Sequence, residues 1–249
     1  MKAVRSARTF GYLFGYLPFS IPALRKVKKV KSGHAPGRTD DLVSREAKKW
    51  ASGILRRADS SVTVRIHGDL PEGPVLFASN HEGNFDIPVL IANLPKPFGF
   101  MSKAEVKKLP VIRKWMVEMN CVFIDRADRR SAVQSIRDMS AMLREGHSML
   151  IFPEGTRSRG TGLGEFKAGF VRVAKDAGAP IVPVAISGTS SIMERNGNFI
   201  CPAVVTVDVL EPIGPDLIEE MPAKEVALLA QERIARTLAG RHNENTAVS

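Results

Sequence analysis

The segment VLFASNHEGNFDIP, residues 75–88, decides the fold. It begins as a short apolar run after Gly73-Pro74, which is typical of a buried strand, and it continues into a polar loop. We expect a helix to begin near Asn84. Ligands and catalytic groups of open α/β sheets collect where strands end. The segment therefore predicts both a sheet and the place of a site.

The rest of the chain alternates in the same way. Strands are expected over residues 62–66, 75–79, 98–101, 121–124, 148–152, 181–186 and 204–209. Apolar residues at helical spacing predict helices over residues 40–58, from Ala132 to Leu143, and from Val226 to Ile234 with an end at Gly240. This order is typical of an α/β fold, a mostly parallel central sheet with helices on both faces. We expect one domain over residues 40–249, after an N-terminal segment and linker over residues 1–39.

Composition excludes several classes of protein. The chain has 249 residues, 44% apolar and 25% charged, which is ordinary for a globular protein. Cys121 and Cys201 are too few for a disulfide framework. The sequence has no HExxH motif and no Cys/His cluster, so we expect no metal site. It also lacks a P-loop. Because it has no GxSxG elbow, no protein nucleophile is evident.

The positive charge is concentrated at the N-terminus. The net charge is +10, and residues 1–31 carry eight lysines and arginines with no acidic residue. A DNA-binding protein more often spreads its basic surface over the fold, so we expect no nucleic-acid partner.

An apolar, aromatic stretch lies between the two basic clusters. Residues 10–24 contain Pro18 and Pro22, and a bilayer-spanning helix needs about 20 apolar residues. A basic cluster follows the stretch where a secretory signal would have a cleavage site. We therefore expect a helical segment that binds an anionic membrane surface, and a peripheral, monotopic protein on the cytoplasmic face of the cell membrane. A spanning helix and an apolar cap packed on the domain are the alternatives.

The first candidate catalytic residues are His81 and Asp86, five positions apart across the turn after a strand. The carboxylate can accept the Nδ1–H of the imidazole, which fixes the tautomer and leaves Nε2 as a general base. The alternative is a loop histidine beside a capping aspartate.

A second polar turn follows the strand in SMLIFPEGTRS, residues 148–158. It carries Glu154, Gly155 and Arg157, and an arginine can bind a phosphate bidentately. A surface turn with a Glu–Arg ion pair is the alternative. The segment VFIDR, residues 122–126, ends in the same way with Arg126. A base without an evident protein nucleophile indicates that a substrate hydroxyl is the nucleophile.

Together these segments resemble the glycerolipid acyltransferase family, of the 1-acylglycerol-3-phosphate O-acyltransferase type. The family's NHxxxxD block is similar to residues 80–86, and its second block is similar to residues 122–126. The FPEGTRS block matches residues 152–158 at every position, and the short apolar block resembles IVPV, residues 181–184. Many members have a glycine before the second block, where this chain has Asn120-Cys121.

The resemblance implies a mechanism. His81 would take the proton of the acceptor hydroxyl while Asp86 orients the ring, and the oxygen would attack the thioester without an acyl-enzyme. The resemblance further implies phosphate binding by Lys103, Arg126, Glu154, Gly155 and Arg157. An acyl-chain pocket would include Val182 and Val184, for which a role in the core is the alternative. The co-substrate would be acyl-CoA or acyl carrier protein, with no further cofactor.

The expected acceptor is 1-acylglycerol-3-phosphate, a membrane lipid, and the product is phosphatidic acid. Glycerol-3-phosphate or another lyso-lipid is an alternative acceptor. A non-enzymatic phospholipid-binding module is a third hypothesis, which leaves the His–Asp pair without a use.

Overall fold

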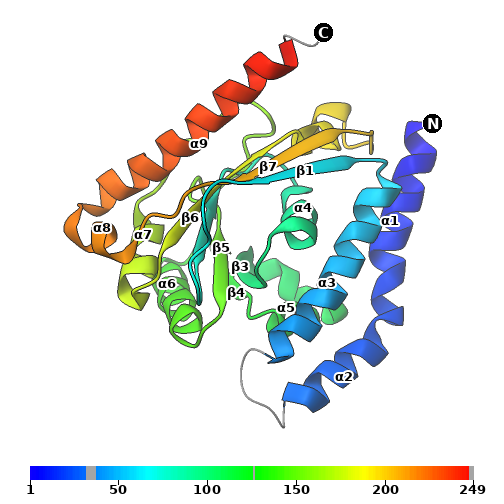
Figure 1. Cartoon of the computed structure of the whole chain (residues 1–249). Coiled ribbons are helices and arrows are strands. Elements are labelled where there is room, and N and C mark those ends of the chain that lie inside the picture. Colours follow the sequence, from blue (N-terminus) through cyan, green and yellow to red (C-terminus); the bar gives the residue numbers. More distant parts are fainter. Residues whose placement is uncertain (32–37, 126, 247–249) are drawn as a thin grey trace.

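The computed structural model describes residues 1–31, 38–125 and 127–246. Its centre is a seven-stranded sheet in the order β1-β7-β6-β2-β5-β3-β4, with helices on both faces (Figure 1). The strands are β1 (Ser61–Ile66), β2 (Leu76–Ser79), β3 (Phe98–Lys103), β4 (Val122–Ile124), β5 (Ser148–Ile151), β6 (Ile181–Ser187) and β7 (Val204–Val209).

Most of the sheet is parallel. β6, β2, β5, β3 and β4 run in one direction, whereas β7 pairs with β6 in the antiparallel sense and β1 runs parallel to β7. Parallel neighbours need a crossover connection, usually a helix. Between β6 and β7 the chain forms only the short helices η2 (Thr189–Ser191) and η3 (Glu194–Asn196), and it returns beside β6 in the opposite direction. The expectation of a mostly parallel sheet is confirmed.

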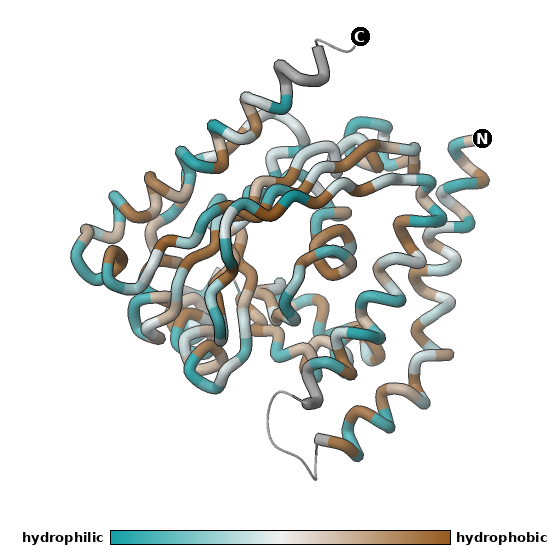
Figure 2. Tube along the Cα trace, viewed as in Figure 1, coloured by the Kyte–Doolittle hydropathy of each residue, from teal (hydrophilic) through white to brown (hydrophobic). Residues whose placement is uncertain are grey.

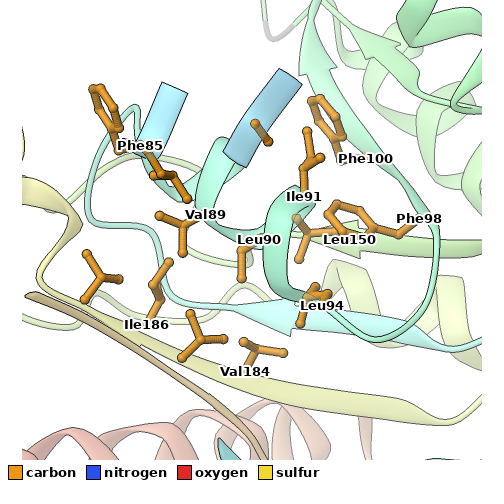
Figure 3. Packing of buried hydrophobic residues seen from close by; sticks show 14 of the residues in the cluster. Phe85, Val89, Leu90, Ile91, Leu94, Phe98, Phe100, Leu150, Val184 and Ile186 are labelled. Carbon is orange, nitrogen blue, oxygen red and sulfur yellow. The ribbon is translucent and has the colours of Figure 1, made fainter. Parts of the chain in front are cut away.

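Both faces of the central strands are apolar. In β6, Val182, Val184 and Ile186 pack toward α3 (Arg38–Arg57) and α4 (Asp86–Asn93), while Ile181 and Ala185 pack toward the opposite layer. Figure 3 shows α4 packed over the sheet on the first face. The opposite layer consists of α6 (Arg129–Arg144), α7 (Gly169–Ala177), α8 (Pro215–Glu220) and α9 (Ala223–Thr246). Each large apolar side chain buried in these layers stabilises the fold by about 1.5–3 kcal/mol.

The expected elements agree closely with the observed ones. Each expected strand is present with bounds that differ by at most two residues, and the expected helix over residues 40–58 is α3. The expected end of the last helix at Gly240 is wrong, because α9 continues to Thr246. A glycine inside a helix costs only about 1 kcal/mol relative to alanine, so it need not end one. Figure 2 shows α9 as a mixture of hydrophilic and hydrophobic residues, as befits a helix with one side toward solvent.

The N-terminal segment forms two helices, α1 (Lys2–Phe19) and α2 (Ile21–Lys31). α1 lies beside α3 (Figure 1), where Arg5 pairs with Asp59 at 2.7 Å and Trp50 Nε1 donates to the Leu13 carbonyl at 3.3 Å. At the junction of the two helices, Trp115 Nε1 of α5 (Pro110–Glu118) donates a hydrogen bond to Ser20 Oγ at 2.8 Å. Within the described ranges, every helix is too short or too polar to cross a bilayer. Residues 32–37 of the expected linker lie outside the described residues.

The topology brings three loops together. β2, β5 and β3 are neighbouring parallel strands, so their carboxyl ends meet at one edge of the sheet. Residues 80–86, residues 152–159 and the short helix η1 (Ala104–Lys108) follow these three strands.

Candidate active site

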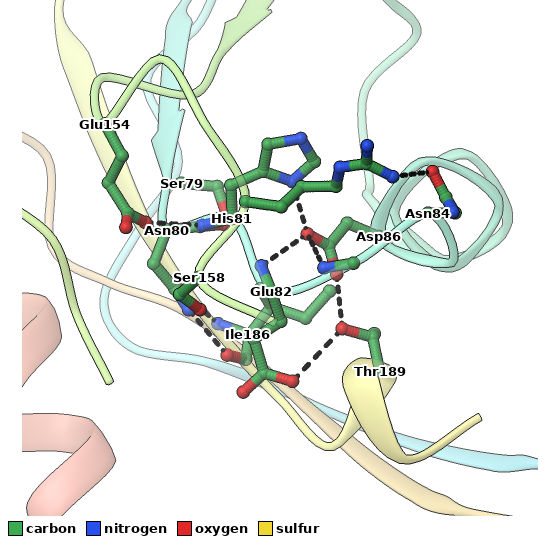
Figure 4. Close-up of polar contacts among 12 residues, drawn as sticks. Ser79, Asn80, His81, Glu82, Asn84, Asp86, Glu154, Ser158, Ile186 and Thr189 are labelled. Atoms are coloured by element: carbon green, nitrogen blue, oxygen red, sulfur yellow. Dashed lines mark hydrogen bonds and ion pairs between the residues drawn. The ribbon is translucent and has the colours of Figure 1, made fainter. Parts of the chain in front are cut away.

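His81 and Asp86 form a hydrogen-bonded pair at this edge. His81 lies in the loop after β2 and Asp86 is the first residue of α4, and Nδ1 is 2.6 Å from Asp86 Oδ2 (Figure 4). The Asp86 carboxylate is fully buried, and its Oδ2 also accepts the N–H groups of Glu82 and Gly83 at 2.7 and 3.1 Å. Because a carboxylate only accepts, Nδ1 carries a hydrogen, and a neutral ring held in this way has its free lone pair on Nε2. That tautomer is the one that a general base at Nε2 would require.

The His81 ring is held flat against an aromatic neighbour. It stacks on Phe152 with 3.9 Å between ring centroids and an angle of 14° between the planes. Stacking on one side and a hydrogen bond at Nδ1 leave the ring little freedom to turn.

The main chain around His81 is fixed by Asn80 and by the loop after β5. The Asn80 side chain accepts from the N–H and donates to the carbonyl of Ile186 in β6, both at 2.8 Å. The N–H of Ser158 donates to the His81 carbonyl at 2.8 Å, and the N–H of Arg159 donates to the Glu82 carbonyl at 2.9 Å. Backbone hydrogen bonds thus join the two polar segments that the sequence singles out.

The buried Glu154 carboxylate accepts a hydrogen bond from this loop. Its Oε1 accepts the His81 N–H at 2.7 Å and its Oε2 accepts the Gly164 N–H at 2.9 Å. Burial raises the pKa of Glu154, and these two hydrogen bonds oppose the rise. Gly155 forms the turn with φ of +72°, and its N–H donates to the Phe152 carbonyl. Both carboxylate oxygens of Glu154 are therefore occupied by main-chain groups, and the ion pair with Arg157 is not formed.

A cleft of about 440 Å³ opens beside the His81 ring. Its charged lining consists of Lys103 at the end of β3, Arg157 and Arg159, and no acidic residue is among the described residues that line it. Arg157 donates to Asn84 Oδ1, and its Nη1 lies 4.0 Å from Glu194 Oε1. The cleft is therefore a positively charged site beside the His81 imidazole. Arg159 was missed by the sequence reasoning, although it directly follows the FPEGTRS segment.

A second, apolar cavity of about 220 Å³ lies next to the cleft. The two share the lining residues Ile87, Phe100, Ser102 and Val106. The far wall of the apolar cavity comes from α1, α3 and α5 and includes Tyr16, Leu17, Trp50, Ile112, Trp115 and Met116. Burial, and then the nearby Glu46, raise the pKa of Tyr16 to about 12, so its hydroxyl stays neutral.

Two of the expected site residues lie in the core, and the position of a third is not described. Val182 and Val184 are fully buried in the core and line neither of these cavities. Arg126 lies outside the described residues. Across the described ranges, no group of three or more His, Cys, Asp or Glu side chains is placed to hold a metal ion.

The known proteins to which this chain is similar include several acyltransferases. The acyltransferase family model matches residues 61–187. A probable 1-acyl-sn-glycerol-3-phosphate acyltransferase of Mycoplasma pneumoniae is 30% identical over 182 residues, which cover 69% of this chain and 68% of the relative. A lyso-ornithine lipid O-acyltransferase of Pseudomonas aeruginosa is 31% identical over 194 residues, which cover 71% of this chain and 72% of that relative.

Other relatives are matched over a smaller share of their length. The chain spans between 43% and 49% of three of them, which include a 1-acyl-sn-glycerol-3-phosphate acyltransferase of Chlamydomonas reinhardtii that is 36% identical over 147 residues. Among solved structures, the 1-acyl-sn-glycerophosphate acyltransferase PlsC of Thermotoga maritima has the same fold. Its TM-score is 0.79 at 22% identity, over 97% of this chain and 98% of that one.

Proposed function

The chain belongs to the acyltransferase family, and we propose that it transfers a fatty acyl group from a thioester to the free hydroxyl of 1-acylglycerol-3-phosphate. The product is phosphatidic acid. The observation that carries this proposal is the His81–Asp86 pair beside a cleft lined by three cationic side chains.

In the proposed reaction His81 Nε2 takes the proton of the acceptor hydroxyl. The acceptor oxygen forms a bond to the thioester carbonyl carbon, the carbon–sulfur bond breaks, and the leaving thiolate takes the proton back from His81 and departs as the thiol. Asp86 stabilises the imidazolium that forms at His81. The hydroxyl of the acceptor is the nucleophile, so no acyl-enzyme is needed.

The charged cleft supports a phosphorylated acceptor. Lys103, Arg157 and Arg159 line the cleft together with His81. A charge-assisted hydrogen bond to phosphate is about twice as strong as a neutral one. Arg126 is proposed as a further phosphate ligand from the family resemblance. Glu154 and Gly155 act in this proposal through the loop that carries His81.

The apolar cavity supports an acyl chain as the second substrate group. It adjoins the cleft, and aliphatic and aromatic side chains line most of it. We propose that it takes the acyl chain of the donor, acyl-CoA or acyl carrier protein, in place of the site expected at Val182 and Val184. The reaction needs no further cofactor.

We propose that α1 and α2 bind the protein to an anionic membrane on its cytoplasmic face. Phe14 and Phe19 of α1 are 55% and 84% exposed, and α2 carries Arg25, Lys26, Lys28 and Lys29. Exposed aromatic rings and lysines together favour the headgroup region of a bilayer.

A second candidate acceptor is a lyso-ornithine lipid, because one relative is named for that substrate. The absence of an acidic side chain from the described lining of the cleft favours phosphate over the ammonium group of ornithine. Glycerol-3-phosphate differs from the leading acceptor only in lacking the first acyl chain.

One experiment separates these acceptors. Purified protein receives lysophosphatidate, glycerol-3-phosphate or lyso-ornithine lipid, each with acyl-CoA and with acyl carrier protein, and products are measured by mass spectrometry. We expect phosphatidic acid from lysophosphatidate, and its loss in His81→Ala. Binding of lysophosphatidate without a product from any acceptor would instead support the non-enzymatic lipid-binding module.

A further inference from the structure

We propose that Thr189 is a positioning residue for the proposed acyl transfer, because its hydroxyl holds the Asp86 carboxylate in the orientation that His81 needs. The proposal rests on the proposed function. Thr189 begins η2, with one residue between it and the end of β6, and it is fully buried. No sequence motif points to it.

The two oxygens of Asp86 have different partners. Oδ2 accepts hydrogen bonds from His81 Nδ1 and from the main chain of Glu82 and Gly83. Oδ1 accepts one from the Thr189 hydroxyl, its hydrogen-bond partner among the described residues (Figure 4). A buried carboxylate oxygen without a donor is costly, so the Thr189 hydroxyl fixes the second end of the carboxylate.

Thr189 Oγ1 also lies 3.2 Å from Glu82 Oε2, and a hydroxyl has only one hydrogen to donate. Glu82 Oε2 already accepts from the N–H groups of Gly188 and Ser190 at 3.0 and 3.2 Å, and from the Ser190 hydroxyl at 3.3 Å. Among the residues that the structure describes, Asp86 Oδ1 has no comparable set of donors. The hydrogen of Thr189 is therefore directed to Asp86.

Glu82 holds the turn that carries Thr189. Burial raises the pKa of Glu82, and the hydrogen bonds from the turn oppose the rise. A protonated Glu82 can donate to Thr189 Oγ1, which then still donates to Asp86, so either state of Glu82 leaves the direction of the Thr189 hydrogen bond unchanged.

The turn itself requires a glycine before Thr189. Gly188 has φ of +98°, and a Cβ there would lie 2.3 Å from the Val204 carbonyl oxygen. The first residue of β7 therefore leaves no room for a side chain at position 188. Glu82 and Gly188 together place the Thr189 hydroxyl without help from the substrate.

The test compares Thr189→Val with Thr189→Ser. Valine keeps the size of the side chain and removes the hydroxyl, whereas serine keeps the hydroxyl. We expect kcat to fall about tenfold in Thr189→Val with the acceptor KM within about twofold, because the lost hydrogen bond acts on the base and leaves the cleft intact. Thr189→Ser should restore most of kcat. Thr237→Val is the matched control, since Thr237 also hydrogen-bonds within the protein but lies on α9.

A second readout does not depend on turnover. The His81 Nδ1–H proton, assigned by its absence in His81→Gln, should give a far-downfield NMR resonance that shifts or broadens in Thr189→Val and persists in Thr189→Ser. An unchanged resonance and kcat in folded Thr189→Val would overturn the proposal, as would failure of serine to restore either. If the wild-type protein transfers no acyl group, the proposed function fails, while the resonance still decides whether Thr189 holds Asp86.

Discussion

Replacing Asp86 by asparagine should remove its charge and keep its shape. Two main-chain N–H groups, from Glu82 and Gly83, point at Oδ2 together with His81 Nδ1–H. These donors repel an amide NH₂, so the carbonyl oxygen of the new side chain should take the Oδ2 position. His81 then keeps an acceptor for Nδ1–H and keeps its tautomer. The NH₂ group faces the Thr189 hydroxyl, which can accept from it and donate to Glu82.

The lost interaction is the attraction between the carboxylate and the imidazolium that forms during proton transfer. Two unit charges about 4 Å apart attract by about 4 kcal/mol at an effective dielectric constant of 20. The neutral hydrogen bond that replaces it retains about 1 kcal/mol. A net loss of about 3 kcal/mol corresponds to a decrease in kcat of about 150-fold.

The assay is steady-state acyl transfer by Asp86→Asn, with thermal unfolding to check that the variant is folded. Asp216→Asn is the control, because Asp216 also lies in the first turn of a helix but is exposed on α8. A kcat within threefold of wild type would mean that no imidazolium forms at His81. A loss of about 10⁴-fold, the size seen where the histidine takes the wrong tautomer, would mean that the two main-chain donors do not fix the amide oxygen.

Three further predictions follow from other parts of the structure. Arg157→Ala should raise the acceptor KM about 10- to 150-fold while the thioester KM changes less than twofold, because one charge-assisted contact to phosphate is lost; equal effects in a kinetic assay that varies each substrate would make Arg157 structural. Asp208→Asn should lower the free energy of unfolding at neutral pH by about 1.5–3 kcal/mol. Burial raises the pKa of Asp208, but hydrogen bonds from Arg241 and His67 outweigh it and leave the pKa lowered. The wild-type protein therefore loses this stability as the pH falls through the lowered pKa of Asp208. The difference in the free energy of unfolding between wild type and Asp208→Asn, measured by urea unfolding, should therefore disappear at acid pH. A difference that does not change with pH would contradict the ion pair. Phe14→Ser with Phe19→Ser should weaken co-sedimentation with anionic liposomes at least tenfold, since each buried phenylalanine contributes about 2 kcal/mol; Leu228→Ser, on α9 and 53% exposed, is the control and should bind as wild type does.

The sheet could be predicted because its central strands are continuous apolar runs between glycines, prolines and polar loops. Residues 75–79 and 181–186 have this character, and both lie in the middle of the observed sheet. The reversed direction of β7 could not be predicted, because an apolar strand looks the same whichever way it runs. Direction was decided by the connection from β6, which contains no crossover helix.

The contacts of the candidate site could likewise be predicted only in part. The spacing of His81 and Asp86 was sufficient to predict their contact, because Asp86 directly follows the short loop that contains His81. Glu154 was expected at a phosphate from the family resemblance, and an ion pair with Arg157 in a surface turn was the alternative. Its actual contacts are the N–H groups of His81 and Gly164, which only the folded main chain brings to it. Thr189 is 103 residues from Asp86 in sequence and belongs to no pattern, so only the pairing of β6 with β2 reveals their contact.

The residues that line the two cavities connect the N-terminal helix α1 with the proposed acyl transfer. α4 begins with Asp86, which accepts a hydrogen bond from His81, and its next residue, Ile87, lines both the charged cleft and the apolar cavity. An acyl chain in the apolar cavity would bring its thioester toward the His81 end of this shared wall. Tyr16 and Leu17 form part of the far wall, and they belong to α1, the helix that presents Phe14 and Phe19 to the outside. The helix proposed to bind the membrane therefore also shapes the space for the acyl chain, so a change in how α1 sits on α3 would affect both membrane binding and the choice of chain.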